Sequence, residues 1–351
     1  MKILAINNYS LHQCLSDAEN GVAPAHHCWG IDYFISMGYR VDTLNYSEGH
    51  GKMMKYIKNF IFCVSNLRRI ARYDCVITFA NPIIGIIAFL RSCGLIHSRL
   101  FTVIHHYTRN PMLYGYKLNT GYEKIFFLSK AIKKIYERRY PNLVNKFYYL
   151  EWGADLKFYQ NSYESICRQG HLDLRIISNG KTFRDLSLAK ECCKAVHVPM
   201  TLISDIVEED DFGEDESSKI INSGTKGVNA ISYNVLLEQY MTNRSIHLIP
   251  LKKDLPTGVL CGLTSLLDAL ALGRPVIISD NSNISIDIEA EGLGLYYKAG
   301  NKESLMSILE YMRNNPDFLE DCGRNARRYA EIHSYQAYCE QLFSYIINNH
   351  S

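Results

Sequence analysis

Short apolar runs alternate with amphipathic segments along this chain, and the alternation predicts a βαβ architecture with parallel sheets covered by helices. In the first half, the runs that we expect to form strands are Lys2–Ile6, Arg40–Leu44, Cys75–Phe79, Leu100–Ile104, Lys124–Leu128 and Lys146–Leu150. In the second half, they are Leu172–Ile177, Met200–Ser204, Val228–Ser232, Ile246–Pro250, Pro275–Ser279 and Gly294–Tyr297. Each set suffices for one Rossmann-like domain.

The two sets divide the chain into two predicted domains, residues 1–165 and 166–330. A length of 351 residues fits about two domains. The polar stretch Lys157–Gln169 separates the sets, and we expect the hinge there. After the first strand we expect a loop that holds Asn20 and Gly21, and then a helix that begins near Pro24, because proline is favoured at a first helical position.

Composition excludes several classes of protein. Hydrophobic residues make up 47% of the chain and charged residues 21%, which is ordinary for a globular protein and excludes a disordered or collagen-like chain. The longest apolar stretch, Val76–Leu90, is interrupted by Asn81 and Pro82 and is too short to span a bilayer. The N-terminus reaches polar residues at Asn7 and Asn8 before a signal sequence is complete, so we expect a cytoplasmic protein.

Charge is distributed unevenly between the two halves. Residues 1–165 carry 20 Lys plus Arg against 11 Asp plus Glu, a net charge of +9, and the remainder carries 18 against 25, a net charge of −7. A basic surface attracts nucleic acid, phosphorylated substrates or an anionic membrane. No helix-turn-helix signature, zinc-ligand spacing or RNP-like motif occurs, so we do not expect a nucleic-acid partner.

Two basic segments of the first half have amphipathic character. The segment from Lys52 to Arg72 places cations among large apolar side chains, and a second run extends from Lys130 to Arg139. Such helices can lie on an anionic membrane surface. The alternative is that both are ordinary helices whose basic faces contact water.

A glycine-led helix in the second half predicts a phosphate site. Gly262, Leu263 and Thr264 open a helix that carries Asp268 and ends at a Gly-Arg-Pro turn. Glycine lets the main chain approach an anionic oxygen, and the first amides of a helix direct partial positive charge toward it. Asp268 has the chemistry to accept hydrogen bonds from a ribose diol. The alternative is a structural helix start that Asp268 stabilises electrostatically.

A second glycine loop carries two cations. Gly180, Lys181 and Arg184 lie in the loop after the expected strand Leu172–Ile177. Arginine binds phosphate oxygens through two parallel bonds and lysine acts as a point charge, so a diphosphate suits this pair. Because both loops follow strands of one parallel sheet, we expect them at the same edge. The alternative is that the two cations are merely solvated.

Histidines follow an expected strand of the first half. His105 and His106 come directly after Leu100–Ile104, and imidazole transfers protons near neutral pH. We slightly favour His105. Gly21 lies in the first loop, where we expect the acceptor or the donor phosphate to approach, whereas we expect His26 and His27 to cap or pack the first helix.

Metal binding is not predicted. The eleven cysteines contain no Cys-x-x-Cys pair, which favours reduced, buried thiols. The acidic run Glu208–Glu216 lacks the glycine at loop position six and the final-glutamate spacing of an EF-hand, and it contains no Asp-x-Asp triplet. We expect a solvated loop there.

The order of these segments resembles the GT-B glycosyltransferases, and the second half is similar to glycosyltransferase family 4. The matching residues are Trp152-Gly153-Ala154-Asp155 with Phe158, the loop Gly180–Asp185, Ser232-Tyr233 before a helix, Gly262–Ile277 and the final helices from Asn325 to about Ile347. The resemblance implies an α/β protein of the GT-B fold, with two Rossmann-like domains facing across a cleft. It also implies that residues 331–351 form a helix that crosses back to the N-terminal domain.

The resemblance further implies roles for single residues. Lys181 and Arg184 would hold the donor diphosphate, and Gly180, Gly262, Leu263 and Thr264 would meet its phosphates. Asp268 would hold the ribose, Ser232 and Tyr233 would meet the base, and a histidine, His105 or His106, would meet the sugar at the cleft. Asp155 would cap a turn. The family carries two glutamates separated by seven residues, but here the first position is Leu260 and the second is Asp268.

These features together imply an enzyme, a glycosyltransferase that moves a sugar from a nucleotide diphosphate sugar to a hydroxyl acceptor. A UDP-sugar is favoured, transfer with retention is expected, and neither a metal nor another cofactor is required. The charge of the first half predicts a glycan or lipid-linked acceptor in bacterial surface polysaccharide assembly, met by a peripheral enzyme at the inner face of the membrane. The alternatives are a nucleotide-sugar epimerase of the same fold and a non-catalytic bilobal ligand-binding protein.

Overall fold

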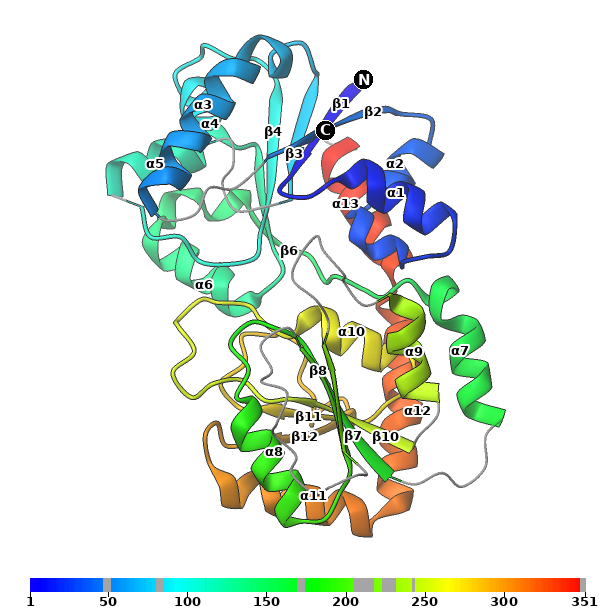
Figure 1. The fold of residues 1–351 in the computed structure, drawn as a ribbon. Helices are drawn as coiled ribbons and strands as arrows, with labels where there is room; N and C mark the ends of the chain where they lie inside the picture. Colours follow the sequence, from blue (N-terminus) through cyan, green and yellow to red (C-terminus); the bar gives the residue numbers. More distant parts are fainter. Residues whose placement is uncertain are drawn as a thin grey trace. The chain divides into compact units, whose positions relative to one another are not determined.

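The computed structural model describes residues 1–46, 52–79, 85–110, 112–168, 174–204, 218–222, 232–241 and 244–347. The chain forms two units. The first contains Met1–Trp152, Thr257–Val259 and Tyr335–Ser351, and the second contains Gly153–Pro256 and Leu260–Ser334. Each unit has a six-stranded parallel sheet with helices packed against it (Figure 1). The predicted α/β class is confirmed.

The sheet of the first unit has the strand order β2-β1-β3-β4-β5-β6. Its strands are β1 (Lys2–Asn7), β2 (Arg40–Asn45), β3 (Cys75–Thr78), β4 (Arg99–Ile104), β5 (Lys124–Phe127) and β6 (Phe147–Tyr149). In β1, the residues Ile3–Ile6 are fully buried, because a central parallel strand has helices over both faces. The edge strand β2 is only partly buried along its length.

Helices cover both faces of this sheet. Figure 1 shows α3, α4 and α5 on one side of it and α1, α2 and α13 on the other. The helices of the unit are α1 (Leu11–Glu19), η1 (Ala25–Cys28), α2 (Ile31–Ser36), α3 (Lys52–Ile70), α4 (Gly85–Ser92), α5 (Met112–Gly121), α6 (Lys130–Arg139), η2 (Pro141–Lys146) and α13 (Tyr335–Ile347). The last helix is tied to this unit by the Tyr335 hydroxyl, which accepts from the N–H of Gly30 at 2.7 Å, and by Lys124, which donates to the carbonyl of Tyr345 at 3.0 Å.

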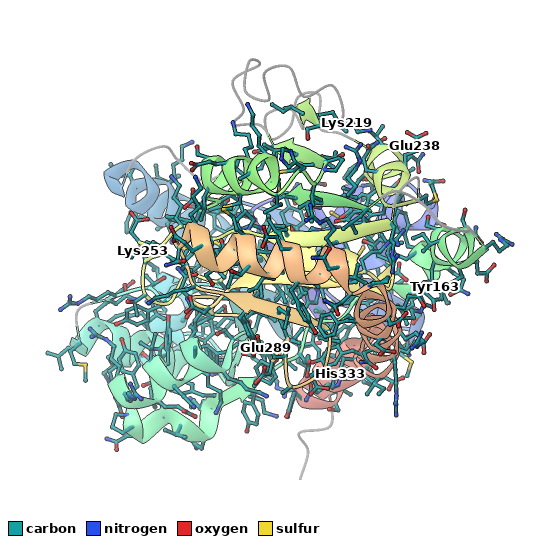
Figure 2. The ribbon with its side chains drawn as sticks, turned by 90° about the horizontal axis from the view of Figure 1, so that it is seen from below. Tyr163, Lys219, Glu238, Lys253, Glu289 and His333 are labelled. Carbon is teal, nitrogen blue, oxygen red and sulfur yellow. The ribbon has the colours of Figure 1, made fainter. Side chains whose placement is uncertain are left out.

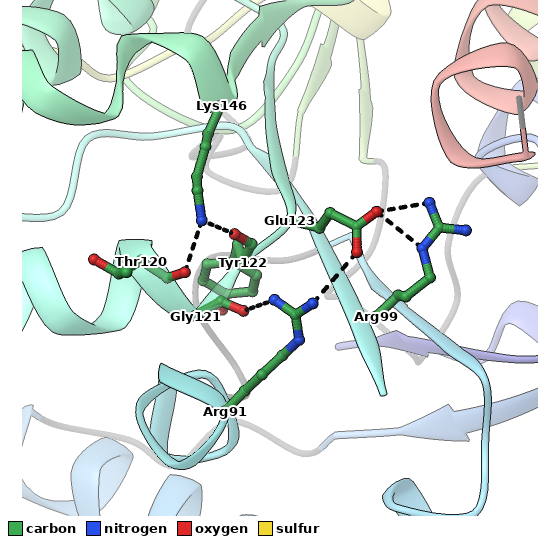
Figure 3. A network of polar contacts seen from close by, with 7 residues as sticks. All are labelled: Arg91, Arg99, Thr120, Gly121, Tyr122, Glu123 and Lys146. Atoms are coloured by element: carbon green, nitrogen blue, oxygen red, sulfur yellow. Dashed lines mark hydrogen bonds and ion pairs between the residues drawn. The ribbon is translucent and has the colours of Figure 1, made fainter. Parts of the chain in front are cut away.

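An ion-pair network joins the starts of β4 and β5 (Figure 3). The Nε and Nη2 atoms of Arg99 both donate to Glu123 Oε1, at 2.9 and 2.7 Å, and Arg91 Nη2 donates to Glu123 Oε2 at 3.3 Å. Lys146 donates to two main-chain carbonyls at the end of α5, at 2.8 Å each (Figure 3). These three cations of the basic first unit therefore hold strand starts in place and are not part of an open basic surface.

The sheet of the second unit has the order β12-β11-β10-β7-β8-β9. Its strands are β7 (Leu174–Asn179), β8 (Met200–Ser204), β9 (Lys219–Asn222), β10 (Arg244–Ile249), β11 (Val276–Ser279) and β12 (Gly294–Tyr297). Strand β9 was not predicted. The expected strand Val228–Ser232 and the acidic run Glu208–Glu216 lie outside the described residues, apart from Ser232.

The helices of the second unit are α7 (Leu156–Arg168), α8 (Leu186–Ala195), α9 (Tyr233–Met241), α10 (Leu263–Ala271), α11 (Lys302–Asn314) and α12 (Pro316–Ile332). Its core includes one cluster in which apolar residues of α8 and α11 pack on the sheet, with Cys192, Leu305 and Met312 buried beside Ile176 and Leu248. Helix α10 packs against α7 and α12. Its segment Ser265–Ala271 is buried throughout, so it is a central element of the unit.

Four sequence-based expectations differ from the structure. The stretch Lys157–Gln169, predicted to be a hinge, is mostly helix α7, whose face buries Tyr159 and Ser162. The boundary lies at 152/153 and not at 165/166, and the C-terminal segment of the first unit starts at residue 335 and not at 331. The first loop contains α1, which Ser10 caps by accepting from the N–H of Gln13, and Pro24 precedes only the short 3-10 helix η1.

Among the described residues, no helix is both long enough and apolar enough to cross a membrane. The eleven cysteines are all free thiols, and eight of them are buried.

Candidate functional site

The second sheet changes direction between β7 and β10, which are neighbours in it. From β7 the chain proceeds outward to β8 and β9, and from β10 it proceeds to β11 and β12 on the opposite side. The connections after two such strands diverge and leave a crevice at their carboxyl ends, where open α/β sheets bind ligands. The loops that start at Gly180 and Pro250 lie at this position.

These two loops are hydrogen-bonded to each other. The N–H of Asp185 donates to the carbonyl of Pro250 at 2.7 Å, and the N–H of Lys252 donates to the carbonyl of Phe183 at 3.0 Å. Between them, Arg184 and Leu251 form an antiparallel bridge. The β7–α8 loop is thus held in place by the β10–α10 loop.

Both glycines of the site approach the guanidinium group of Arg184. Gly180 has a φ of +129°, and a Cβ there would lie 2.7 Å from Arg184 Nη2. Gly262 has a φ of +88°, and a Cβ there would lie 2.7 Å from Ile249 Cγ2 and 3.6 Å from Arg184 Nη2. Both positions therefore require glycine, for backbone conformation and for space. The two motifs that the sequence predicted separately converge on one cation.

Arg184 is held beneath the loops. It is 7% exposed, its Nη1 donates to the carbonyl of Thr182 at 3.1 Å, and its Nη2 lies 3.5 Å from the hydroxyl of Ser265. Burial lowers the pKa of Arg184 to about 10, so the side chain is still a cation at neutral pH. Lys181 lies in the same loop and is half-buried. The loop thus contains one fixed and one more accessible positive charge.

The N-terminus of α10 lies at this edge. Gly262 is the N-cap residue and makes no side-chain cap hydrogen bond, and the first amides of a helix, here from Leu263 and Thr264 onward, have no partner within the helix. Such amides bind anions. Ser265, which sequence reasoning missed, donates to the carbonyl of Asn179 at 3.0 Å and so joins α10 to the end of β7. The sequence signal that could have identified Ser265 is its position three residues after the N-cap residue Gly262.

Asp268 is buried among other residues of the unit, and the expected ribose contact stays a prediction. It is 2% exposed, and it accepts from the hydroxyl of Tyr159 at 2.5 Å and from the amide of Asn179 at 3.4 Å. Burial raises the pKa of Asp268 to about 7, although the hydrogen bonds from Tyr159 and Asn179 lower it. Asp268 therefore joins three elements, α7, β7 and α10, beneath the loops.

Other predicted residues of the second unit lie as follows. Ser232 is exposed, and its carbonyl accepts from the N–H of Leu236 in the first turn of α9. Tyr233 begins α9 and contacts the ring of Phe158, with ring centroids 5.4 Å apart. Asp155 caps a turn, as predicted, because its Oδ1 accepts from the N–H of Lys157 at 3.2 Å.

Phe183 was not singled out from the sequence. Its φ is +53°, in the left-handed region that residues other than glycine rarely adopt, and its side chain is 37% exposed. The hydrogen bond from Lys252 to its carbonyl holds this conformation. An aromatic ring fixed at a ligand-binding edge can stack on a base or a sugar.

The carboxyl edge of the first sheet gathers aromatic rings around His105. The ring of Trp29 stacks on that of Trp152 at 4.4 Å and meets the ring of His105 edge-on at 4.7 Å. Burial, together with the neighbouring His106, lowers the pKa of His105 to about 4. At neutral pH its imidazole is therefore uncharged, and it can exchange hydrogen bonds but does not act as a cation. His106 is exposed and pairs with Val259 through an antiparallel bridge.

The segment Thr257–Val259 belongs to the first unit although its sequence neighbours belong to the second. The N–H of Tyr107 donates to the carbonyl of Gly258 at 2.7 Å, next to the bridge between His106 and Val259. A Cβ at Gly258 would lie 2.5 Å from the Cβ of Tyr107, so a glycine is needed at this contact. The loop of His106 is thus braced by a segment that lies three residues before Gly262 in sequence.

The remaining predictions of the first unit fall at helix ends. Gly21 lies in the turn that ends α1, where its φ is +65° and its N–H donates to the carbonyl of Ala18. Glycine is common at this position because it ends helices, so the turn by itself accounts for a glycine at residue 21. His26 and His27 lie in η1, which packs against α1, and their rings also pack on Trp152, with ring centroids 5.3 and 6.3 Å away.

Within the described residues, no group of three or more His, Cys, Asp or Glu side chains is placed to hold a metal ion.

Comparison with solved structures extends over almost the whole chain. A glycosyltransferase from Rickettsia africae ESF-5 is 13% identical, with a TM-score of 0.65 over 99% of both chains. HepE from Anabaena in complex with UDP is 12% identical, with a TM-score of 0.66 over 99% of both chains. WaaG, a glycosyltransferase involved in lipopolysaccharide biosynthesis, is 12% identical, with a TM-score of 0.66 over 99% of this chain and 100% of that one.

The chain has the GT-B fold. The fold expected from the sequence resemblance is thereby confirmed, with a Rossmann-like sheet in each unit. No family model matches the chain, and no curated protein matches it at a significant level. At these identities the likeness establishes the fold, and the activity is inferred from the geometry of the GT-B site itself.

Proposed function

We propose that this protein is a glycosyltransferase that takes a sugar from a nucleotide diphosphate sugar, with a UDP-sugar favoured, and transfers it to a hydroxyl acceptor. The observation that carries the proposal is the convergence of Gly180, Gly262 and the buried Arg184 at the switch point of the second sheet. Similar solved structures that hold UDP or UDP-glucose support the choice of donor.

The residues of this site match the demands of the reaction. Negative charge builds up on the diphosphate as the sugar leaves, and fixed donors aimed at that charge lower the barrier. Lys181 and the first amides of α10 would contact the phosphates, and Arg184 would raise the positive potential beneath them. Thr264 would add a hydroxyl, and Ser232 and Tyr233 would meet the base. The proposal includes no metal, because these groups supply the positive charge.

The first unit would supply the contact with the sugar or the acceptor. His105 is uncharged at neutral pH, so it would donate or accept a single hydrogen bond, and His106 is the more exposed imidazole. Transfer with retention would let the leaving phosphate accept the proton of the acceptor hydroxyl. The anomeric configuration of the product, read by NMR against that of the donor, tests this part: an inverted product would contradict it.

A donor screen tests the main proposal. UDP, GDP and dTDP are titrated by calorimetry, and the matching sugar nucleotides are assayed for hydrolysis with and without EDTA. We expect UDP to bind and EDTA to leave turnover intact. Absence of binding by all three nucleotides would contradict the proposal, strict dependence on added manganese would contradict the metal-free mechanism, and epimerised donor without hydrolysis would favour the epimerase.

We further propose that the acceptor is a lipid-linked glycan presented at an anionic membrane. Four large apolar side chains of α3 point to water at positions i, i+3, i+4 and i+7: Ile57, Phe60, Ile61 and Val64 are 43 to 58% exposed. This spacing forms one stripe on a helix, called here the α3 stripe. The other face of α3 buries Cys63 and Ile70, so the stripe is additional to the core.

Neighbouring helices extend this surface. Helix α3 packs against α4, and α4 packs against α5 (Figure 1). On α5, Met112 and Leu113 are 54% and 85% exposed. Exposed cations, Lys58 and Arg68 on α3 and Lys117 on α5, accompany these side chains. Apolar side chains that enter the headgroup region beside cations that meet anionic lipid are typical of interfacial helices.

The second basic run contributes less to such a surface. In α6, Lys133 pairs with Glu137 at 2.5 Å, and Lys130 lies over the ring of Tyr149 at 4.9 Å. Lys52 and Lys55 begin α3, but the placement of their side chains is outside the described part of the chain. The proposal therefore depends on the α3 stripe and on the exposed residues of α5.

A further inference from the structure

A cavity lies in the second unit, at the amino edge of its sheet. Its volume is about 350 Å³, which is within the range of small-molecule sites. The end of α7, the start of β10, the Gly273–Pro275 turn before β11, and one face of α12 line it. Because the strands are parallel, this edge is opposite to the carboxyl edge that holds Gly180 and Gly262. The cavity is therefore separate from the proposed donor site.

Three guanidinium groups from three different elements converge on this cavity. Arg244 begins β10, Arg274 lies in the turn before β11, and Arg324 lies on α12, whereas Glu320 is the acidic residue of the lining. The sequence places these arginines far apart, so their convergence is a product of the tertiary structure. The lining carries an excess of positive charge, in a unit whose net charge is negative.

Arg274 is the innermost of these cations. It is 7% exposed and donates from Nη2 to the carbonyl of Tyr240. Burial lowers the pKa of Arg274 to about 10, which leaves it charged at neutral pH. A guanidinium group has five N–H donors in a fixed plane, more than the bond to Tyr240 uses. A cation in a poorly solvated wall attracts an anion more strongly than one in water.

Arg244 and Arg324 form the rim. Arg244 Nη2 donates to the carbonyl of Pro316 at 2.7 Å and lies 3.8 Å from Glu320 Oε1, and Arg324 pairs with Asp321. The Glu320 and Asp321 side chains are about 60% exposed. Exposed ion pairs of this kind contribute little to stability. An incoming dianion can therefore displace the carboxylates from the guanidinium groups.

The remaining wall is suited to a carbon skeleton. The ring of Tyr163, labelled in Figure 2, lies on α7 with the guanidinium carbon of Arg327 over it at 4.2 Å. Pro275 and Leu319 supply apolar surface in the same lining. A Cβ at Gly273 would lie 3.0 Å from the ring of Tyr163, so glycine keeps this wall open.

We propose that this cavity binds a small phosphorylated metabolite, with its phosphate on Arg244, Arg274 and Arg324 and its carbon skeleton against Tyr163. A phosphate dianion matches the site better than a single carboxylate, because it carries more charge and three acceptor oxygens that suit several guanidinium groups. The proposal does not depend on the glycosyltransferase activity, since none of these residues belongs to the donor site.

Titration calorimetry on the full chain tests it with inorganic phosphate, glucose 6-phosphate and uncharged glucose as probes. The R244Q/R324Q variant removes the two rim cations, which are partly exposed and are not expected to be needed for folding. The control is R328Q, which changes an exposed arginine of α12 outside the cavity. The K181A variant distinguishes the donor site from this one, and unfolding curves confirm that each variant is folded.

We expect glucose 6-phosphate to bind the wild type, R328Q and K181A alike, and to bind R244Q/R324Q about tenfold or more weakly. Inorganic phosphate should bind the same variants in the same order, and less tightly because it does not reach Tyr163. Three results would overturn the proposal: no phosphorylated probe binds the wild type, glucose binds as tightly as its phosphate, or affinity is lost in K181A but retained in R244Q/R324Q. The last result would assign the anion to the donor site.

Discussion

Arg184 and Lys181 lie in the same loop but differ in burial, so we expect their substitutions to have different effects. Arg184 is buried and bonded to Thr182, whereas Lys181 is half-buried. We expect Lys181→Ala to weaken UDP binding about ten- to hundredfold without a change in Tm, because it removes a charge-assisted hydrogen bond of ~1.5 to 3 kcal/mol. Lys194→Ala, an exposed lysine at the far end of α8, is the control.

Arg184→Ala should lower both UDP affinity and Tm, because Thr182 and Ser265 lose a buried partner. Calorimetry with UDP and thermal unfolding separate the two variants. Unchanged UDP affinity in both variants would contradict the location of the donor site at this edge of the sheet.

Asp268 makes the stability of the folded protein depend on pH, and the direction of this dependence follows from its pKa. Burial raises its pKa to about 7 in the folded state, above the ordinary value near 3.8 in the unfolded state. The folded protein therefore binds the proton more tightly, so the contribution of Asp268 to stability is complete below about pH 4 and is lost as the pH rises to about 7. The loss is on the order of a few kcal/mol.

We accordingly expect Asp268→Asn, which cannot ionise, to gain stability relative to the wild type between pH 4 and pH 7. Urea unfolding of both proteins across this range measures the difference. A constant difference at all pH values would show that the carboxyl group titrates alike in the folded and unfolded states.

At the scale of single elements, α3 has a packed face and an exposed apolar face, which the sequence pattern alone does not distinguish. One face packs in the first unit, and the α3 stripe of four exposed apolar residues is on the other. We expect the protein to float with anionic vesicles at low salt and to be released at high salt, since each cation near such a surface contributes ~1 kcal/mol. Neutral vesicles should bind less.

The double variant Phe60→Ser/Ile61→Ser should bind anionic vesicles less without loss of stability, because both side chains are exposed. Val22→Ser, which changes an apolar residue that is 53% exposed outside α3, is the matched control. Failure of the wild type to float with either vesicle type at low salt would refute the membrane proposal but not the donor site.

At the scale of the whole molecule, buried histidines predict sensitivity to acid. Burial lowers the pKa of His27 and His105 to about 4 and that of His247 to about 3, and it places the pKa of His26 well below the ordinary value of 6.5. As the pH falls, these histidines are protonated in the unfolded chain before they are protonated in the folded one. Their contribution to stability is therefore fully present above about pH 6.5 and decreases as the pH falls toward 4. Asp268 acts in the opposite direction but is one group, so we expect the four histidines to set the sign of the change.

We therefore expect the free energy of unfolding to decrease between pH 6.5 and pH 4.5 by ~1.4 kcal/mol per pH unit for each net proton taken up. His27→Asn should reduce this slope by about one proton, whereas His97→Asn, at an exposed position, should not. Equal slopes in the wild type and His27→Asn would contradict the buried state of His27.

The sequence by itself determined the βαβ rhythm and the positions of the two glycine loops that meet at Arg184. Continuous apolar runs such as Ile3–Ile6 are specific for strands buried on both faces, and Gly180 and Gly262 mark backbone that must have a positive φ. Eleven of the twelve expected strands overlap strands of the structure, because periodicity is a local property of the chain. The hinge was misplaced because a polar stretch on one helix face, in α7, resembles a linker.

Only the tertiary structure decided which side chains are open to a ligand. Asp268 has the right chemistry for a ribose, but Tyr159 and Asn179 surround its carboxyl group from elements that lie 109 and 89 residues away in sequence. The same holds for the cavity of Arg244, Arg274 and Arg324. Burial and the convergence of distant groups depend on long-range packing, which a pattern of neighbouring residues does not contain.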